Sequence, residues 1–195
     1  MRRPGFNMWL AALAMMAALP CAVSAQAKTI RIVAFGDSAT YGYLVAHNDA
    51  FSAQLQRALR AKGYDVTVAN KGMNGDTTAG ALRRFDDAIG PGTDIAIVEF
   101  GTNDLRLRVP RQRIDANLSA IIRSLKARRI EVIIAGLGSL DLSAVARANG
   151  VAYAQWTLPP GRYHARDHAH FNANGYRIIV SRMMPLVEAA IARRR

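Results

Sequence analysis

Strand-like and helix-like segments alternate along most of this 195-residue chain. Short apolar, β-branched runs indicate strands, and each is followed by a longer segment with apolar residues at helical spacing. The predicted strands cover residues 29–35, 65–69, 94–100, 130–135 and 151–156, and the predicted helices cover residues 49–62, 77–88, 111–129, 140–148 and 173–193. Because parallel neighbours need crossovers, five βα units in this order predict an α/β fold with a parallel sheet between two helical layers.

Local signals refine two of the predicted helices. Asp76 and Thr77 stand at the start of the helix over residues 77–88, and either side chain can cap it. Pro185 lies inside the helix over residues 173–193, where a missing N–H predicts a kink.

The first 25 residues are typical of a secretory signal peptide. Arg2 and Arg3 precede an apolar run over residues 8–23, and small residues follow it up to Ala25. A membrane anchor is the alternative, but Pro20 interrupts the run, which is also short for a span. We therefore expect a leader over residues 1–25, cleaved after Ala25 or Ala27, and a periplasmic or secreted protein.

Residues 26–195 are expected to form a single domain without a disulfide. The hydrophobic content of 51% argues against disorder, and Cys21, the only cysteine, lies in the predicted leader. Removing the leader takes away two arginines and no acids, so the formal net charge falls from +12 to +10. The basic residues are scattered, which favours solvated helix faces over nucleic-acid binding and leaves weak association with an anionic membrane surface open.

Three loops that directly follow predicted strands carry candidate catalytic groups. In parallel sheets the ligand crevice lies beyond the carboxyl ends of the strands, so these loops should meet there. Ser38 follows the end of the first predicted strand and is the candidate nucleophile. A serine nucleophile requires a base to accept its proton and donors to hold the oxyanion. The backbone N–H groups of Ser38 and Gly75 and the side-chain amide of Asn103 are the candidate donors. Gly75 allows a close backbone approach, and Asn103 donates without a charge to desolvate.

A loop before the last helix holds three of the four histidines. Asp167 and His170 are three residues apart, so the carboxylate can hold one imidazole nitrogen while the other accepts the serine proton. His168 is too close to Asp167 for that geometry in the usual arrangement, although the sequence does not exclude it. A metal site formed by His164, His168, His170 and Asp167 is a second interpretation of this loop.

Four short blocks in this order resemble those of the SGNH, or GDSL, esterases and lipases. The blocks are Gly36-Asp37-Ser38, Asn74-Gly75-Asp76-Thr77, Gly101-Thr102-Asn103-Asp104 and Asp167-His168-Ala169-His170. The resemblance implies Ser38 as nucleophile, His170 as base, Asp167 as its partner, and Ser38, Gly75 and Asn103 as the oxyanion hole. It also implies a three-layer, flavodoxin-like five-stranded parallel sheet, and an acyl-enzyme route that needs no cofactor and no metal.

The segment from Ser38 through Gly75 looks most like the arylesterase, thioesterase and lysophospholipase branch of that family. Small-molecule or lipid acyl esters are therefore the expected substrates. The stretch between Ala135 and Asp167 looks shorter than in that branch, so chain-length preference does not carry over. Asn74 replaces a serine that is often found before the glycine of the second block, which is a milder departure, and neither difference touches a catalytic role.

Several alternatives stay open from the sequence. Ser38 could serve only as a helix cap, and Asn103 and Asp104 could form only Asx turns. An acyltransferase could use the same site, and a catalytically silent flavodoxin-like module could share the fold, although dinucleotide and Walker fingerprints are missing from the sequence. His47 is interpreted as a cleft wall or a surface residue.

A group of arginines follows the Asn103 loop, namely Arg106, Arg108, Arg111 and Arg113. Our hypothesis is that this group draws acidic substrates to the crevice, with surface solubility as the alternative.

Overall fold

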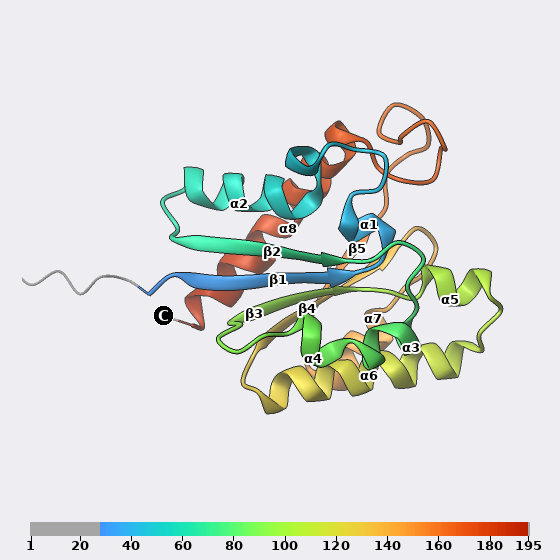
Figure 1. Ribbon diagram of the computed structural model, residues 1–195, viewed down its shortest axis with the longest axis horizontal. Helices are drawn as coiled ribbons and strands as arrows, with labels where there is room; N and C mark the ends of the chain where they lie inside the picture. The colour runs from blue at the N-terminus through green and yellow to red at the C-terminus, as the bar shows by residue number, and fades with distance from the viewer. Residues whose placement is uncertain (1–27, 195) are drawn as a thin grey trace, which may run out of the picture.

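A computed structural model describes residues 28–194, so the predicted leader lies outside the described residues. Five parallel strands form one sheet in the order β2-β1-β3-β4-β5 (Figure 1). The strands are β1 (Ile30–Gly36), β2 (Val66–Gly72), β3 (Ile95–Glu99), β4 (Glu131–Leu137) and β5 (Ala152–Trp156). The predicted α/β fold with an all-parallel, five-stranded sheet is confirmed.

Helices cover both faces of the sheet, as Figure 1 shows. One face carries α2 (Phe51–Ala61) and α8 (Ala173–Ala192). The other carries α3 (Thr78–Arg83), α4 (Phe85–Ala88), α6 (Arg111–Ala127) and α7 (Ser143–Asn149). Three short elements follow strand ends or precede α2, namely α1 (Ser38–Tyr41), the 3-10 helix η1 (His47–Asp49) and α5 (Thr102–Arg106).

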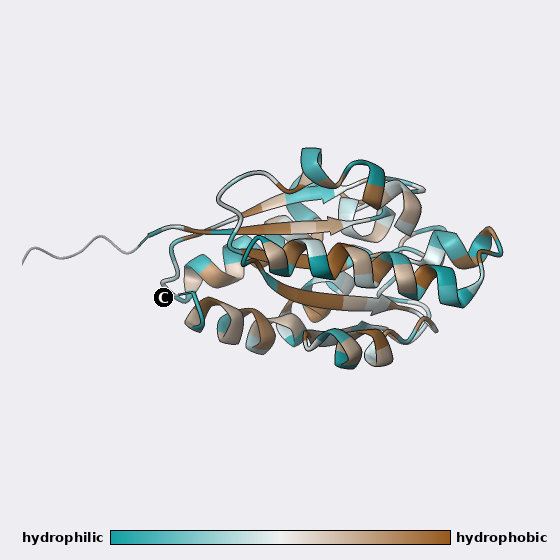
Figure 2. Cartoon of the chain, turned by 90° about the horizontal axis from the view of Figure 1, so that it is seen from below, coloured by the Kyte–Doolittle hydropathy of each residue, from teal (hydrophilic) through white to brown (hydrophobic). Residues whose placement is uncertain are grey.

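Side chains of the central strands alternate between two apolar cores. Ile32 and Ile97 pack with α2 and α8, whereas Phe35 and Val98 pack with the helices of the opposite face. Figure 2 shows these strands as mostly hydrophobic, with hydrophilic residues concentrated on the helices and loops. Burial on both faces explains the nearly unbroken apolar runs from which the strands were predicted.

Several predicted boundaries differ from the structure, and two of the differences have identifiable reasons. The helix expected over residues 77–88 is divided at Arg84, which leaves helical geometry and bonds to the ends of two strands. Strand β2 continues to Gly72 instead of ending at residue 69, because residues 70–72 pair with residues 34–36 of β1. Thr77 caps α3 by accepting from the N–H of Gly80, as predicted.

Both ends of the described chain are fixed to one carboxylate. Asp94 is 2% exposed, and its Oδ1 lies 2.9 Å from Lys28 Nζ and 3.4 Å from an amino nitrogen of Arg194. Burial alone would raise the pKa of Asp94, but the backbone N–H of Arg31 and the ammonium of Lys28 lower it. The two ends therefore lie together at the amino edge of the sheet, opposite α1 and α5 (Figure 1).

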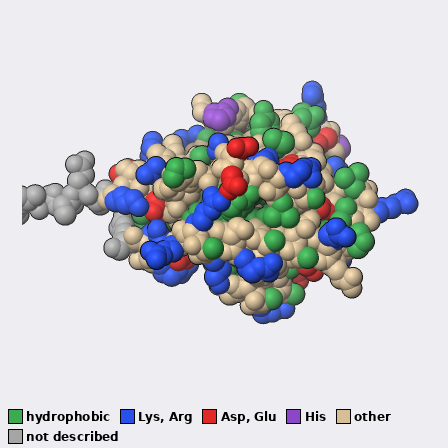
Figure 3. Space-filling view, turned by 60° about the horizontal axis from the view of Figure 1, so that its bottom comes forward, with side chains coloured by type: hydrophobic (Ala, Val, Ile, Leu, Met, Phe, Trp, Pro, Cys, Tyr) green, Lys and Arg blue, Asp and Glu red, His purple; other side chains and the backbone are tan. Residues whose placement is uncertain are grey.

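The surface of the described part of the chain is basic without one dominant patch in view. Figure 3 shows Lys and Arg side chains spread over the visible face. None of the helices within residues 28–194 combines the length and the apolar character needed to cross a bilayer.

Candidate active site

Ser38 begins α1 immediately after the carboxyl end of β1. Asp37 caps this short helix by accepting from the N–H of Ala39 at 2.9 Å, and its own N–H donates to the carbonyl of Glu99 at 3.2 Å. A Cβ at Gly36 would lie 1.9 Å from Thr40 Oγ1, so only glycine allows the helix to turn so tightly over the strand end. The tight turn leaves the Ser38 side chain on the rim of the sheet.

The structure brings Ser38, His170 and Asp167 together. His170 Nε2 lies 2.8 Å from Ser38 Oγ, and His170 Nδ1 lies 2.5 Å from Asp167 Oδ2. The other carboxylate oxygen of Asp167 accepts from the backbone N–H groups of Ala169 and His170, both at 3.1 Å. Partial burial raises the pKa of Asp167, but the hydrogen bonds from His170 and from this backbone outweigh it and lower the pKa to about 2. Asp167 is therefore a carboxylate at neutral pH.

The rest of the histidine loop holds His170 in place. Tyr43 contacts the imidazole edge-on with ring centroids 5.0 Å apart, and the N–H of Ala165 donates to the carbonyl of His170 at 2.7 Å. His168 lies at a φ of 57°, is exposed, and donates its backbone N–H to the carbonyl of Ala165 at 3.0 Å, whereas its side chain makes no hydrogen bond within residues 28–194. Over the same residues, no group of three or more potential metal ligands is gathered, so the histidines of this loop do not converge on one point.

The three candidate oxyanion donors differ in whether they already donate a hydrogen bond within the protein. Within the described chain, the N–H groups of Ser38 and Gly75 have no hydrogen-bond acceptor. Gly75 has a φ of 74°, and a Cβ there would meet no atom within 4 Å, so glycine is required by the backbone conformation and not by lack of space. The amide of Asn103 already donates to Asp37 Oδ2 at 3.1 Å and to the carbonyl of Asp76 at 2.9 Å. Asn103 thus joins the loops that follow β1 and β2 as well as facing the site.

A buried carboxyl pair lies beneath Ser38, and sequence reasoning missed it. Glu99, at the end of β3, is 1% exposed, and its Oε2 accepts from the hydroxyl of Thr40 at 2.9 Å. Within residues 28–194 its Oε1 has no hydrogen-bond partner, and the carboxyl of Asp37 lies close enough to influence its pKa. Burial and the charge of Asp37 raise the pKa of Glu99 well above the ordinary range. Of the two carboxyls, Glu99 therefore favours the protonated form more strongly, while Asp37 accepts from the N–H of Ala39 and from the amide of Asn103.

Arg84 is a second residue whose position the sequence did not reveal. It was counted among the scattered basic residues, but its side chain is only 17% exposed and lies 4.6 Å from the ring of Phe35. Its guanidinium donates to Asp76 Oδ2 at 2.7 Å and to the carbonyls of Lys71 and Gly36 at 2.9 and 3.0 Å. Arg84 thereby fixes the Gly75 loop to the ends of β1 and β2.

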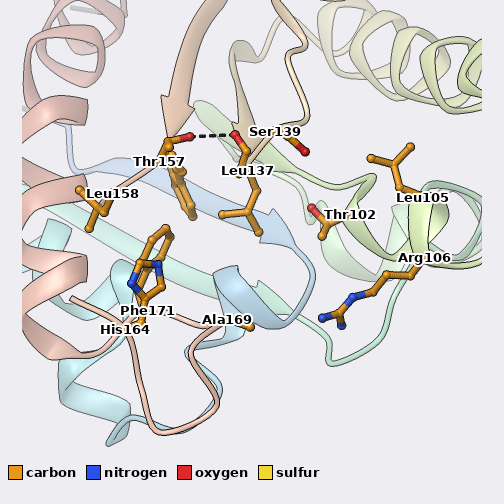
Figure 4. Close-up of a pocket in the computed structure, with 12 residues that line it drawn as sticks. Thr102, Leu105, Arg106, Leu137, Ser139, Thr157, Leu158, His164, Ala169 and Phe171 are labelled. Carbon is orange, nitrogen blue, oxygen red and sulfur yellow. Dashed lines mark hydrogen bonds between the residues drawn. The ribbon is translucent and has the colours of Figure 1, made fainter. Parts of the chain in front are cut away.

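Two adjoining cavities open at this edge of the sheet. The smaller, about 50 Å³, is lined by Ser38, Asn103 and His170 among others, although not by Gly75. The larger, about 330 Å³, shares with it Thr102, Arg106, Leu137, Ala169 and Phe171 (Figure 4). His47 lines neither cavity and borders a separate depression beside α2. The expected crevice beyond the strand ends is therefore present, and its wider part lies beside the serine.

Comparisons with known proteins show the family of this chain. Residues 34–158 match the family model described as the GDSL-like Lipase/Acylhydrolase family. A curated arylesterase from Vibrio mimicus is 31% identical over 115 residues, which span 58% of this chain and 58% of that protein. Esterase TesA from Pseudomonas aeruginosa is 30% identical over 139 residues, which span 67% of this chain and 68% of that protein.

A solved structure supports the same assignment. AlinE4, described as an SGNH-hydrolase family esterase, has a TM-score of 0.66 and 27% identity, and the match covers 85% of this chain and 98% of that one. The four blocks, the parallel sheet and the family match over 125 residues point the same way. The chain therefore belongs to the GDSL-like, or SGNH, lipase/acylhydrolase family, whose members are hydrolases of ester bonds.

Proposed function

We propose that this chain is a serine ester hydrolase that acts on small-molecule or lipid acyl esters through an acyl-enzyme intermediate. The observation that carries the proposal is the continuous set of hydrogen bonds from Ser38 through His170 to Asp167. Ser38 and His170 are 132 residues apart in sequence, and turn formation gives no reason for their 2.8 Å contact. The ionised Asp167 favours the imidazole tautomer whose free nitrogen accepts the serine proton.

In the first half-reaction, Ser38 Oγ bonds to the ester carbonyl carbon while its proton passes to His170 Nε2. The carbonyl π electrons move to the oxygen, which becomes the oxyanion. When the intermediate collapses, the bond to the alcohol oxygen breaks and His170 returns the proton to that oxygen. In the second half-reaction, a water oxygen bonds to the acyl carbon while its proton passes to His170. The bond from that carbon to Ser38 Oγ then breaks, Ser38 Oγ takes the proton back from His170, and the acid is released.

The N–H groups of Ser38 and Gly75 are the principal oxyanion donors in this proposal. Both are without an acceptor in the described chain, so they are ready to donate when the charge develops. Asn103 contributes an amide hydrogen that also donates to an acceptor of a neighbouring loop. Its two existing hydrogen bonds, to Asp37 and to the carbonyl of Asp76, hold this donor in place. The buried pair of Glu99 and Asp37 supports this arrangement from below.

Covalent labelling tests the proposal directly. A fluorophosphonate probe should label the wild-type protein at Ser38 and should not label Ser38→Ala, while both proteins show the same circular dichroism spectrum. In parallel, the wild type should turn over short aryl esters and Ser38→Ala should not. Equal labelling or equal turnover by the two proteins would remove Ser38 from the role of nucleophile.

We also propose export to the periplasm or the exterior, with residues 1–25 acting as the leader. The support is the basic start, the apolar run and the small residues before Ala25 and Ala27 in the sequence. Amino-terminal sequencing of protein recovered from the periplasmic fraction should begin just after one of these alanines. Recovery of the uncleaved chain in the cytoplasm would contradict export.

A further inference from the structure

The larger cavity beside Ser38 has a distinctive polarity. Its walls are lined by apolar side chains together with Thr102, Ser139, Thr157, His164 and one charged residue, Arg106, with no carboxylate among them. A volume of about 330 Å³ lies in the range that small ligands or parts of ligands fill in enzymes. The cavity is therefore suited to a small substrate portion with at least one polar group.

Arg106 is the cation of both cavities. It ends α5 and is exposed, and its side chain forms no hydrogen bond or ion pair within residues 28–194. Figure 4 shows its guanidinium extending from α5 toward the cavity, with Leu158, His164 and Phe171 on the facing side. An arginine with five free donors at a substrate cavity presents a planar fork that matches a carboxylate or a phosphate.

The other arginines of the same segment are placed differently. Arg111 is occupied by Asp115 at 2.7 Å and by the carbonyl of Asp141 at 2.6 Å. Arg108 is exposed and, like Arg113, lines neither cavity. The sequence hypothesis of a four-arginine group is thus narrowed to one residue with direct access to the site.

Unpaired polar atoms in the cavity wall are a second, independent observation. Five buried side-chain polar atoms of the described residues lack a hydrogen-bond partner, and three belong to residues that line this cavity, namely Thr102 Oγ1, Trp156 Nε1 and His164 Nδ1. Trp156 is 1% exposed. Buried polar groups are nearly always paired in folded proteins, so such a cluster indicates a water or ligand partner. The residues that carry these atoms line the cavity, so this wall suits a bound group with oxygen atoms better than a purely aliphatic acyl chain.

We propose that Arg106 binds an anionic group, a carboxylate or a phosphate, on the ester that Ser38 attacks. This inference rests on the proposed ester hydrolysis and names the substrate class of the same site. The anionic group occupies the larger cavity, where Arg106 binds it through paired N–H donors and the polar wall contacts its neighbouring oxygen atoms. The ester carbonyl then lies in the smaller cavity, which Arg106 and Ser38 line together.

Matched pairs of esters test the inference and identify the anion. In the first pair, 4-nitrophenyl butyrate is compared with the 4-nitrophenyl half-ester of succinate, which carries a carboxylate on the acyl side. In the second, phenyl butyrate is compared with the butyrate ester of 3-hydroxybenzoate, which carries it on the alcohol side. In the third, glycerol monobutyrate is compared with its glycerol 3-phosphate counterpart. The measured quantity is the ratio of kcat/KM for the anionic and neutral members of each pair.

Arg106→Gln should lower this ratio about tenfold or more in at least one pair, as loss of a charge-assisted hydrogen bond does. Arg108→Gln is the matched control. It removes the same charge only two residues from Arg106, but the Arg108 side chain lines neither cavity, so this variant should leave the ratio unchanged. The pair that responds shows whether the anion is an acyl carboxylate, an alcohol carboxylate or a phosphate.

Two results would overturn the inference alone. One is an Arg106→Gln ratio equal to that of the wild type in all three pairs, and the other is an equal drop in Arg108→Gln, which would indicate only the overall positive field. In both cases Ser38-dependent turnover of the neutral esters would leave the proposed hydrolysis intact. Wild-type protein that turns over no ester of any pair would instead overturn both proposals.

Discussion

Replacing Glu99 with glutamine should remove a pH dependence of stability that the buried carboxyl pair imposes. Glutamine is nearly isosteric with protonated glutamic acid, so its amide oxygen can accept from Thr40 while its N–H donates to Asp37. Folded wild-type protein retains the Glu99 proton to well above the ordinary value of 4.5, because Glu99 is fully buried beside the charge of Asp37. The unfolded chain loses that proton near the ordinary value. Above it, the folded state therefore binds one proton more than the unfolded state, and wild-type stability declines as pH rises.

The size of the effect follows from this single proton. The free energy of unfolding of the wild type should fall relative to Glu99→Gln by about 1.4 kcal/mol per pH unit, from near pH 5 up to the pKa of Glu99 in the folded protein. Urea unfolding of both proteins at pH 5, 6, 7 and 8 measures the difference, in which the other titrating groups cancel. The variant should become progressively the more stable of the two.

Glu131→Gln is the matched control, since Glu131 lies on the same sheet but pairs at the surface with Arg193 at 2.8 Å. Its difference from the wild type should be small and similar at all four pH values, as expected for an exposed ion pair. Parallel curves for the wild type and Glu99→Gln from pH 5 to 8 would refute the reasoning, because they would mean that folding does not hold a proton on Glu99.

Three further predictions concern the site. Asn103→Ala should lower kcat for an aryl ester on the order of a hundredfold, because one oxyanion donor and the tie between two loops are lost, and unchanged kcat would contradict this role. Asp167→Asn should lower kcat by about 10³ or more, because asparagine favours the wrong tautomer of His170, and a loss below tenfold would argue against the pairing. Arg84→Met should reduce the free energy of unfolding by about 3–5 kcal/mol in urea titrations, because the buried carboxylate of Asp76 loses its cation and keeps only the N–H of Thr77, whereas exposed Arg83→Met should change it little.

The sequence predicted the sheet and the meeting of its loops because those depend on periodic patterns. Apolar runs buried on both faces and helices with one apolar stripe leave one arrangement open, and its carboxyl edge gathers the loops of Ser38, Gly75 and Asn103. The order of the strands also determines that the loop of His170 reaches this edge. This is why the sequence could predict that residues far apart in the chain lie together.

What the sequence did not reveal depends on side-chain direction. Glu99 stands in an apolar strand, where an acid without an adjacent base is the only hint of a buried pair. Arg84 and Arg83 are equivalent in the sequence, yet one is inserted between strand ends and the other is exposed. Arg106 is likewise one of several neighbouring arginines in the sequence. Only its position at the end of α5 places it, and not the others, at the two cavities. The predicted helix over residues 77–88 is interrupted at Arg84 also because of side-chain direction. The three hydrogen-bond partners of its guanidinium outweigh the local helix propensity.

The shared attachment of Lys28 and Arg194 to Asp94 has a practical consequence for engineering. Lys28 and Arg194 contact the same carboxylate, so a short linker could join them at little entropic cost. The described domain is therefore a good candidate for circular permutation. New ends could be opened at the exposed turn over residues 90–92. Because the original ends lie opposite the cleft, a fusion partner or a solid support attached there would leave the entrance for esters unobstructed.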